Sequence, residues 1–132
     1  MNENNNMRSK IKGMLFEFSS EEFQRSVWTT HTWQNKKIVY WPVEFVCMWF
    51  DDTFYDLDWL FNNKKLNKKE WEIISAFHEF FKDNRNRFLD EKFIAKSILL
   101  LDYEPWQQMQ KKAQETLDQL NAIGWEKIDA EI

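Results

Sequence analysis

The 132-residue sequence has few of the residues that form tight turns, disulfides and metal sites. Two glycines and two prolines are too few for the many turns of β-sandwiches and barrels, so helices are favoured. One cysteine, Cys47, excludes an internal disulfide framework and a cysteine-rich zinc site. No run of about 20 apolar residues occurs, so we expect no membrane-spanning segment.

Residue patterns that carry catalysis are equally scarce. His31 and His78 are far apart and do not form a helical metal-binding pair. Two glycines cannot build a phosphate-binding or dinucleotide-binding loop. Residues 41–61 contain no Lys, Arg or His that could activate Cys47 as a thiolate. We therefore predict no catalytic residue, no metal and no cofactor, and we expect that the protein is not an enzyme.

Aromatic side chains, in contrast, are abundant. Hydrophobic residues make up 43% of the chain and aromatic residues 17%, which suits one folded domain of this length despite 30% charged residues. We predict an all-α, single-domain bundle of four to five helices with an aromatic-rich core, whose N-terminal part is irregular or contains a short β element. The polar, asparagine-rich start predicts a disordered leader over residues 1–12 before a domain over residues 13–132. Glu17 interrupts the only early apolar run, so we expect no signal peptide and a cytoplasmic protein.

Helix start signals and apolar spacing locate the expected helices. A capping box from Ser19 predicts a helix over about residues 20–31, with a strand over 26–33 as the alternative. Further helices are expected to start at Pro42, Asn67, Asp90 and Pro105. Their apolar positions recur at helical spacing: 43, 46, 49 and 50; 71, 74, 77 and 81; 94, 98 and 101; 106, 109, 113, 117 and 120. We expect Gly124 to end the last helix and Trp125 and Ile128 to fold back onto the bundle.

The net charge of −4 is concentrated in one segment. Residues 41–61 hold five acidic and no basic side chains, whereas residues 1–40 carry +2 and residues 62–132 carry −1. Unbalanced carboxylates repel one another, and a cationic partner would relieve that repulsion. Tyrosine and tryptophan are common at interface hot spots. We therefore predict a partner-binding site made of Glu44, Asp51, Asp52, Tyr55, Asp56, Asp58 and Trp59. The alternative is an ordinary acidic loop beside core aromatics.

Several short motifs follow one another from this segment onward. A Pro-Val-Glu-Phe helix start at 42–45 leads into Trp-Phe-Asp-Asp at 49–52 and then Tyr55. An Ala-Phe-His-Glu-Phe-Phe stretch follows at 76–81, and Trp-Gln-Gln-Met at 106–109. This combination resembles the immunity proteins of contact-dependent growth inhibition and related polymorphic toxin systems of bacteria.

The resemblance covers about residues 40–120 and implies a cytoplasmic antidote that binds a cognate toxin domain, often a nuclease, and occludes it. Toxins that act on nucleic acid tend to be basic, which agrees with an acidic, aromatic patch. A net charge of −4 argues against nonspecific binding of nucleic acid by the chain itself. The N-terminal 40 residues match no family pattern.

Two other function classes remain open. In one, the aromatic segment is core and the domain forms a homo-oligomer or joins another complex. In the other, aromatic side chains line a small-ligand pocket, with Asp51 or Asp52 as acid or base and His78 nearby.

Overall fold

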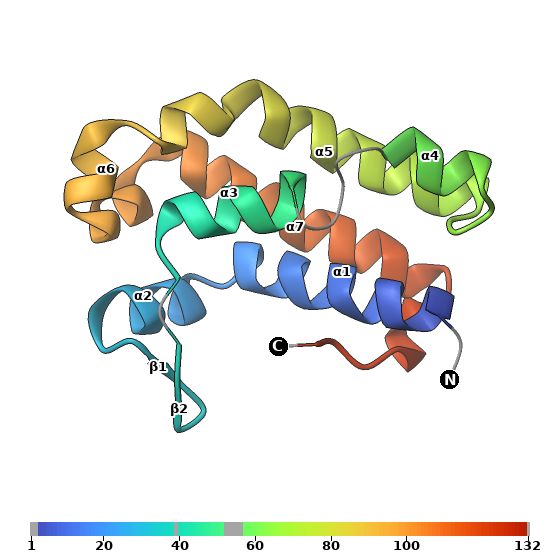
Figure 1. Cartoon of the computed structure of the whole chain (residues 1–132), viewed down its shortest axis with the longest axis horizontal. Coiled ribbons are helices and arrows are strands. Elements are labelled where there is room, and N and C mark those ends of the chain that lie inside the picture. The colour runs from blue at the N-terminus through green and yellow to red at the C-terminus, as the bar shows by residue number, and fades with distance from the viewer. Residues whose placement is uncertain (1–2, 39, 52–56, 132) are drawn as a thin grey trace.

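The structure is a computed structural model that describes residues 3–38, 40–51 and 57–131. The all-α class is confirmed, with one small antiparallel hairpin in the N-terminal part. The elements are α1 (Glu3–Ser19), α2 (Glu21–Thr29), β1 (Thr32–Trp33), β2 (Lys36–Lys37), α3 (Pro42–Phe50), α4 (Leu57–Asn62), α5 (Lys68–Phe88), α6 (Glu91–Ala95), η1 (Ser97–Asp102), α7 (Glu104–Ala122) and η2 (Trp125–Lys127). Helix α7 packs against both α1 and α5, and α3 belongs to the same bundle of helices (Figure 1).

The expected disordered leader over residues 1–12 is wrong in the part that the structure describes. Helix α1 begins at Glu3 and runs through the proposed boundary at residue 13. Ile11 is fully buried, and the guanidinium of Arg8 forms an ion pair with a carboxylate of α5 at 2.7 Å. The Lys12 ammonium donates hydrogen bonds to two carbonyls near the C-terminal end, at 2.7 and 2.8 Å. Distant segments therefore supply the partners that order this polar stretch.

Local start signals were read correctly at most helices. Helix α3 begins at Pro42, and Asn67 caps α5 in a reciprocal capping box with Glu70. Asp90 caps α6, and Pro105 lies in the first turn of α7. The N-cap of α2 is Ser20 rather than Ser19: its hydroxyl accepts a hydrogen bond from the Phe23 amide at 3.0 Å. Gly124 follows α7 with a φ of 113°, a conformation that favours glycine.

Aromatic rings fill the core, as predicted. The ring of Phe18 lies 5.3 to 6.0 Å from the rings of Phe45, Trp49, Phe77 and Phe81, which come from α3 and α5. All five side chains are buried. The apolar stripe of α7 is confirmed as core: Trp106, Met109, Ala113, Leu117 and Leu120.

The helix expected from Asp90 through Leu101 is wrong in its length and in its buried face. Helix α6 ends at Ala95, the next residue is extended, and the chain continues as the short 3-10 helix η1. Ile94 is 61% exposed and its neighbour Phe93 is buried instead, whereas Leu101 is buried as expected. The apolar side chain of Ile94 therefore belongs to the surface rather than to the core.

The C-terminal segment is fastened across α1. The Ser9 carbonyl accepts a hydrogen bond from the Glu131 amide at 3.0 Å, and the Ser9 hydroxyl donates to the Asp129 carbonyl. Gly13 lies directly beneath this segment: a Cβ at that position would be 1.8 Å from the Glu131 carbonyl oxygen. Glycine is therefore required here by space, because the backbone of residue 131 occupies the place of a side chain.

We expect Gly13→Ala to displace the C-terminal segment without unfolding the bundle. The added methyl clashes with backbone atoms of Glu131, while alanine is about 1 kcal/mol more favourable than glycine inside a helix. Hydrogen exchange should show faster exchange of the Glu131 amide. Gly124→Ala serves as the control, because it meets no atom within 4 Å and strains only its own backbone. Unchanged protection of the Glu131 amide in Gly13→Ala would contradict this assignment.

Candidate functional site

The start of α3 fixes the position of an exposed tryptophan. Pro42 opens the helix, and the Glu44 carboxylate accepts a hydrogen bond from the Trp41 amide at 2.9 Å. The indole of Trp41 stays 41% exposed, with its ring 5.3 Å from the ring of His31. His31 has a φ of 58°, and its Nδ1 lies 2.8 Å from the Val27 carbonyl oxygen. Hydrogen bonds thus fix both the backbone amide of Trp41 and the neighbouring ring of His31.

Exposed apolar side chains from two elements meet beside this tryptophan. Val43 on α3 is 43% exposed, and Ile94 on α6 is more exposed still. Together with Trp41, Pro42 and Ala95 they line an open groove of about 330 Å³. Large exposed apolar side chains that cluster around one groove are typical of binding surfaces. We call these five residues the α3–α6 groove.

The sequence did not indicate this groove. The apolar spacing predicts Val43 and Ile94 on helical stripes that face the core. The break after α6, which exposes Ile94, depends on the extended backbone of Lys96 and carries no strong local signal such as glycine or proline. Only the tertiary structure brings the ends of α3 and α6 together.

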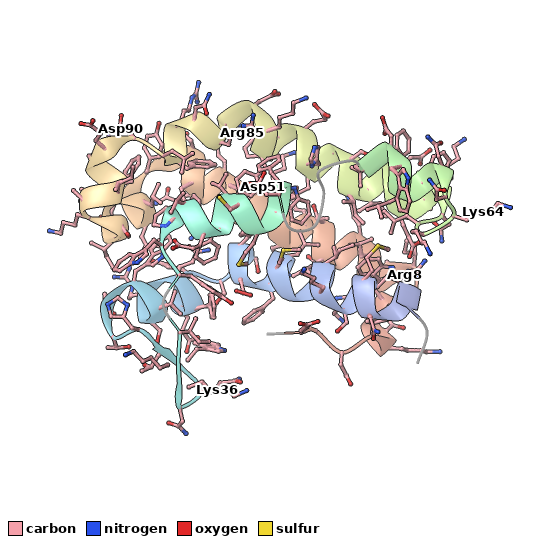
Figure 2. All side chains as sticks on the ribbon, viewed as in Figure 1. Arg8, Lys36, Asp51, Lys64, Arg85 and Asp90 are labelled. Carbon is pink, nitrogen blue, oxygen red and sulfur yellow. The ribbon has the colours of Figure 1, made fainter. Side chains whose placement is uncertain are left out.

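The structure describes four of the seven expected partner-binding residues. Glu44 is partly exposed and caps α3, Asp51 is exposed at the C-terminal end of α3, and Asp58 and Trp59 are exposed on α4. Figure 2 shows Asp51 at the end of its helix, below α5. The Asp58 carboxylate accepts a hydrogen bond from the Trp71 indole at 3.2 Å. The predicted residues Asp52, Tyr55 and Asp56 lie outside the described residues.

None of the three described carboxylates forms an ion pair within residues 3–38, 40–51 and 57–131. The ion pairs in those ranges are Arg8–Glu70 and Arg25–Glu21. The guanidinium of Arg85 on α5 instead lies 5.0 Å from the centre of the Phe50 ring. Glu44, Asp51 and Asp58 therefore keep their negative charge unneutralised by the described lysines and arginines.

His78 is partly buried between aromatic side chains of α3 and α5. Its Nδ1 accepts a hydrogen bond from the Trp49 indole at 3.1 Å, and its ring lies 5.3 Å from the ring of Phe50. Burial lowers the pKa of His78, because the charged imidazolium is disfavoured away from water. Neither the α3–α6 groove nor the pocket between α4 and α5 is lined by His78 or Asp51.

Within the described residues, no three His, Cys, Asp or Glu side chains come together as metal ligands. No described helix is both long enough and apolar enough to cross a bilayer. Neither family models, nor curated proteins, nor solved structures give a match to this chain.

Proposed function

We propose that this protein is a cytoplasmic immunity protein that binds a cognate toxin domain and occludes its active or substrate-binding surface. The observation that carries the proposal is the α3–α6 groove, an apolar depression on the helix whose carboxylates have no ion-pair partner among the described residues. The resemblance of the motifs from Pro42 onward to immunity proteins supplies the class of partner.

The groove suits a protein partner because it combines an aromatic anchor with aliphatic neighbours. Trp41, Val43 and Ile94 are large enough to form the desolvated centre of an interface. Binding energy in such interfaces is concentrated in a few central side chains. A toxin segment with apolar side chains would therefore gain most of its affinity in this groove.

The carboxylates contribute by steering and by choosing the partner. Asp51 and Asp58 are exposed and have no ion-pair partner in the described part, so they attract a basic surface over a distance of about 10 Å at moderate salt. Carboxylates at the edge of an interface change the association rate more than the final affinity. The partner expected from this arrangement is a basic protein domain, such as a nuclease.

The test is binding of the toxin domain encoded beside this chain, measured by calorimetry and stopped-flow kinetics. We expect Ile94→Ser to weaken binding by about 2 kcal/mol, because an anchor is lost from the centre of the interface. Ile123→Ser is the matched control, since Ile123 is also exposed, at 40%, but lies at the end of α7. Asp51→Asn combined with Asp58→Asn should slow association and reduce its salt dependence.

Three outcomes would contradict the proposal. Equal affinities of Ile94→Ser and Ile123→Ser would remove the groove from the interface. An unchanged association rate in the double asparagine variant would remove the steering role. A mass in solution that doubles with concentration, and that Ile94→Ser returns to the monomer, would assign the groove to self-association instead.

A further inference from the structure

An open pocket is lined by the turn between α4 and α5. Figure 1 shows this turn at the end of the molecule opposite α6. The volume of the pocket is about 490 Å³, within the range of pockets that hold small molecules. The described residues that line it come from α1 and from the α4–α5 turn: Arg8, Phe61, Asn62, Lys64, Leu66 and Asn67. Figure 2 labels Arg8 and Lys64 at this end of the molecule.

The turn that carries most of these residues is fixed by backbone hydrogen bonds. The amides of Lys65 and Leu66 both donate to the Leu60 carbonyl, at 2.8 and 3.3 Å. Lys64 has a φ of 60°, and Leu66 is buried beneath it. The lining side chains therefore start from a defined backbone, so the loop itself needs little ordering when a ligand binds.

The polar groups left over in the pocket are donors. Arg8 uses Nε and Nη2 to donate to Glu70, at 2.7 and 2.8 Å, and its Nη1 has no partner in the described part of the chain. The side-chain oxygen of Asn67 accepts from the Glu70 amide, which leaves its NH₂ group available. The side chains of Asn62 and Lys64 make no hydrogen bond to the described residues, and no described lining residue is acidic.

The charged side chains of the α4–α5 turn have the same sign, whereas the acidic Asp58 lies one helical turn before Phe61 and accepts a hydrogen bond from Trp71. Residues 62–69 contain four lysines and no acid, although the whole chain is acidic. Lys68 and Lys69 are exposed on the first turn of α5. The next acid along the chain, Glu70, is buried and already accepts hydrogen bonds from Arg8, Asn67 and Trp125. The pocket is thus a local positive region that an anion would enter.

We propose that this pocket binds a small organic phosphate. The phosphate lies between Lys64 and Nη1 of Arg8, within reach of the two asparagine amides. The apolar or planar body of the ligand lies on the partly exposed ring of Phe61. A phosphate monoester suits this donor set better than a carboxylate, because it has three terminal oxygens and a charge of about −1.5 to −2 at neutral pH.

The test titrates the full chain with AMP, with adenosine and with inorganic phosphate, followed by two-dimensional NMR of the amide groups. We expect saturable shifts at Lys64, Leu66 and the Asn62 side chain with AMP, weaker binding of inorganic phosphate, and none of adenosine. Lys64→Ala should weaken AMP binding about tenfold, the effect of one lost charge-assisted hydrogen bond. The matched control is Lys36→Ala, which removes an exposed lysine of the β1–β2 hairpin.

Four outcomes would overturn the proposal. Absence of saturable shifts with AMP removes the site. Equal losses in Lys64→Ala and Lys36→Ala show general attraction of anions to lysines. Equal affinity for AMP and inorganic phosphate removes the role of Phe61. A single-stranded oligonucleotide that binds at the same amides more tightly than AMP reassigns the site to nucleic acid. Each result is independent of toxin binding at the α3–α6 groove.

Discussion

Glu70→Ala is expected to lower the free energy of unfolding by about 3 to 5 kcal/mol, the cost of leaving a buried charge without its partner. The Glu70 carboxylate is buried and accepts hydrogen bonds from Arg8 on α1, at 2.7 and 2.8 Å, and from the Trp125 indole, at 2.6 Å. It also accepts from the Asn67 amide at 2.9 Å. One side chain therefore joins α1, α5 and the C-terminal turn, and its removal leaves the guanidinium of Arg8 largely buried.

The comparison is with the other ion pair in the described part, Arg25–Glu21 on the surface of α2. Both of its side chains are more than half exposed, so Glu21→Ala should cost less than about 1 kcal/mol. Urea unfolding followed by tryptophan fluorescence measures both variants. A loss in Glu70→Ala no larger than in Glu21→Ala would refute the central role of Glu70.

The same contacts make the contribution of Glu70 to the free energy of unfolding depend on pH. Burial alone would raise the pKa of Glu70, but hydrogen bonds from Arg8, Asn67 and Trp125, with the charge of Arg8, hold it below its ordinary value. The stabilisation is therefore fully present above the unfolded-state pKa of about 4.5 and is lost as the pH falls through the folded-state pKa.

Glu17 is expected to have the opposite effect, so that stability decreases from about pH 5 to about pH 8. Glu17 on α1 is 5% exposed, and its Oε2 has no hydrogen-bond partner in the described residues. Burial raises the pKa of Glu17 from 4.5 to about 8. Between these values the folded protein keeps a proton that the unfolded chain has released. The free energy of unfolding then falls by about 1.4 kcal/mol per pH unit.

Glu17→Gln removes this titration and should flatten the stability curve over the same range. The variant should be more stable than the wild type at about pH 8, because no charge has to be buried there. Urea unfolding at several pH values gives the slope, and Glu72→Gln, an exposed carboxylate on α5, is the control. Parallel slopes for Glu17→Gln and the wild type would show that another group titrates.

Local signals predicted the parts of the fold that depend on neighbours in the sequence. Asn67 and Asp90 were identified as caps because capping is decided within about three residues. The buried stripe of α7 followed from its helical spacing. The order of α1 could not be predicted in this way, because the partners of Arg8 and Lys12 are 62 and more than 100 residues away.

In the candidate site, too, the residues marked by local sequence were predicted and those that depend on tertiary structure were not. The acidic and aromatic segment could be predicted because its residues follow one another in the sequence. Asp51 and Trp59 on this segment are exposed. Glu44 was expected to bind a partner, and it also has a structural role as the cap of α3. Ile94 was expected in the core and instead lines the α3–α6 groove, since helix α6 ends at Ala95 and does not continue. Asp52, Tyr55 and Asp56 remain predictions.

The contact of α1 with α7 and with the C-terminal segment has a consequence for how the chain is made. A ribosome adds about 5 to 20 residues per second, so α1 emerges several seconds before most of α7 exists. During that time the face of α1 that packs against α7 is uncovered. Helix α1 of the nascent chain is thus exposed to chaperones and to premature association until α7 has been synthesised.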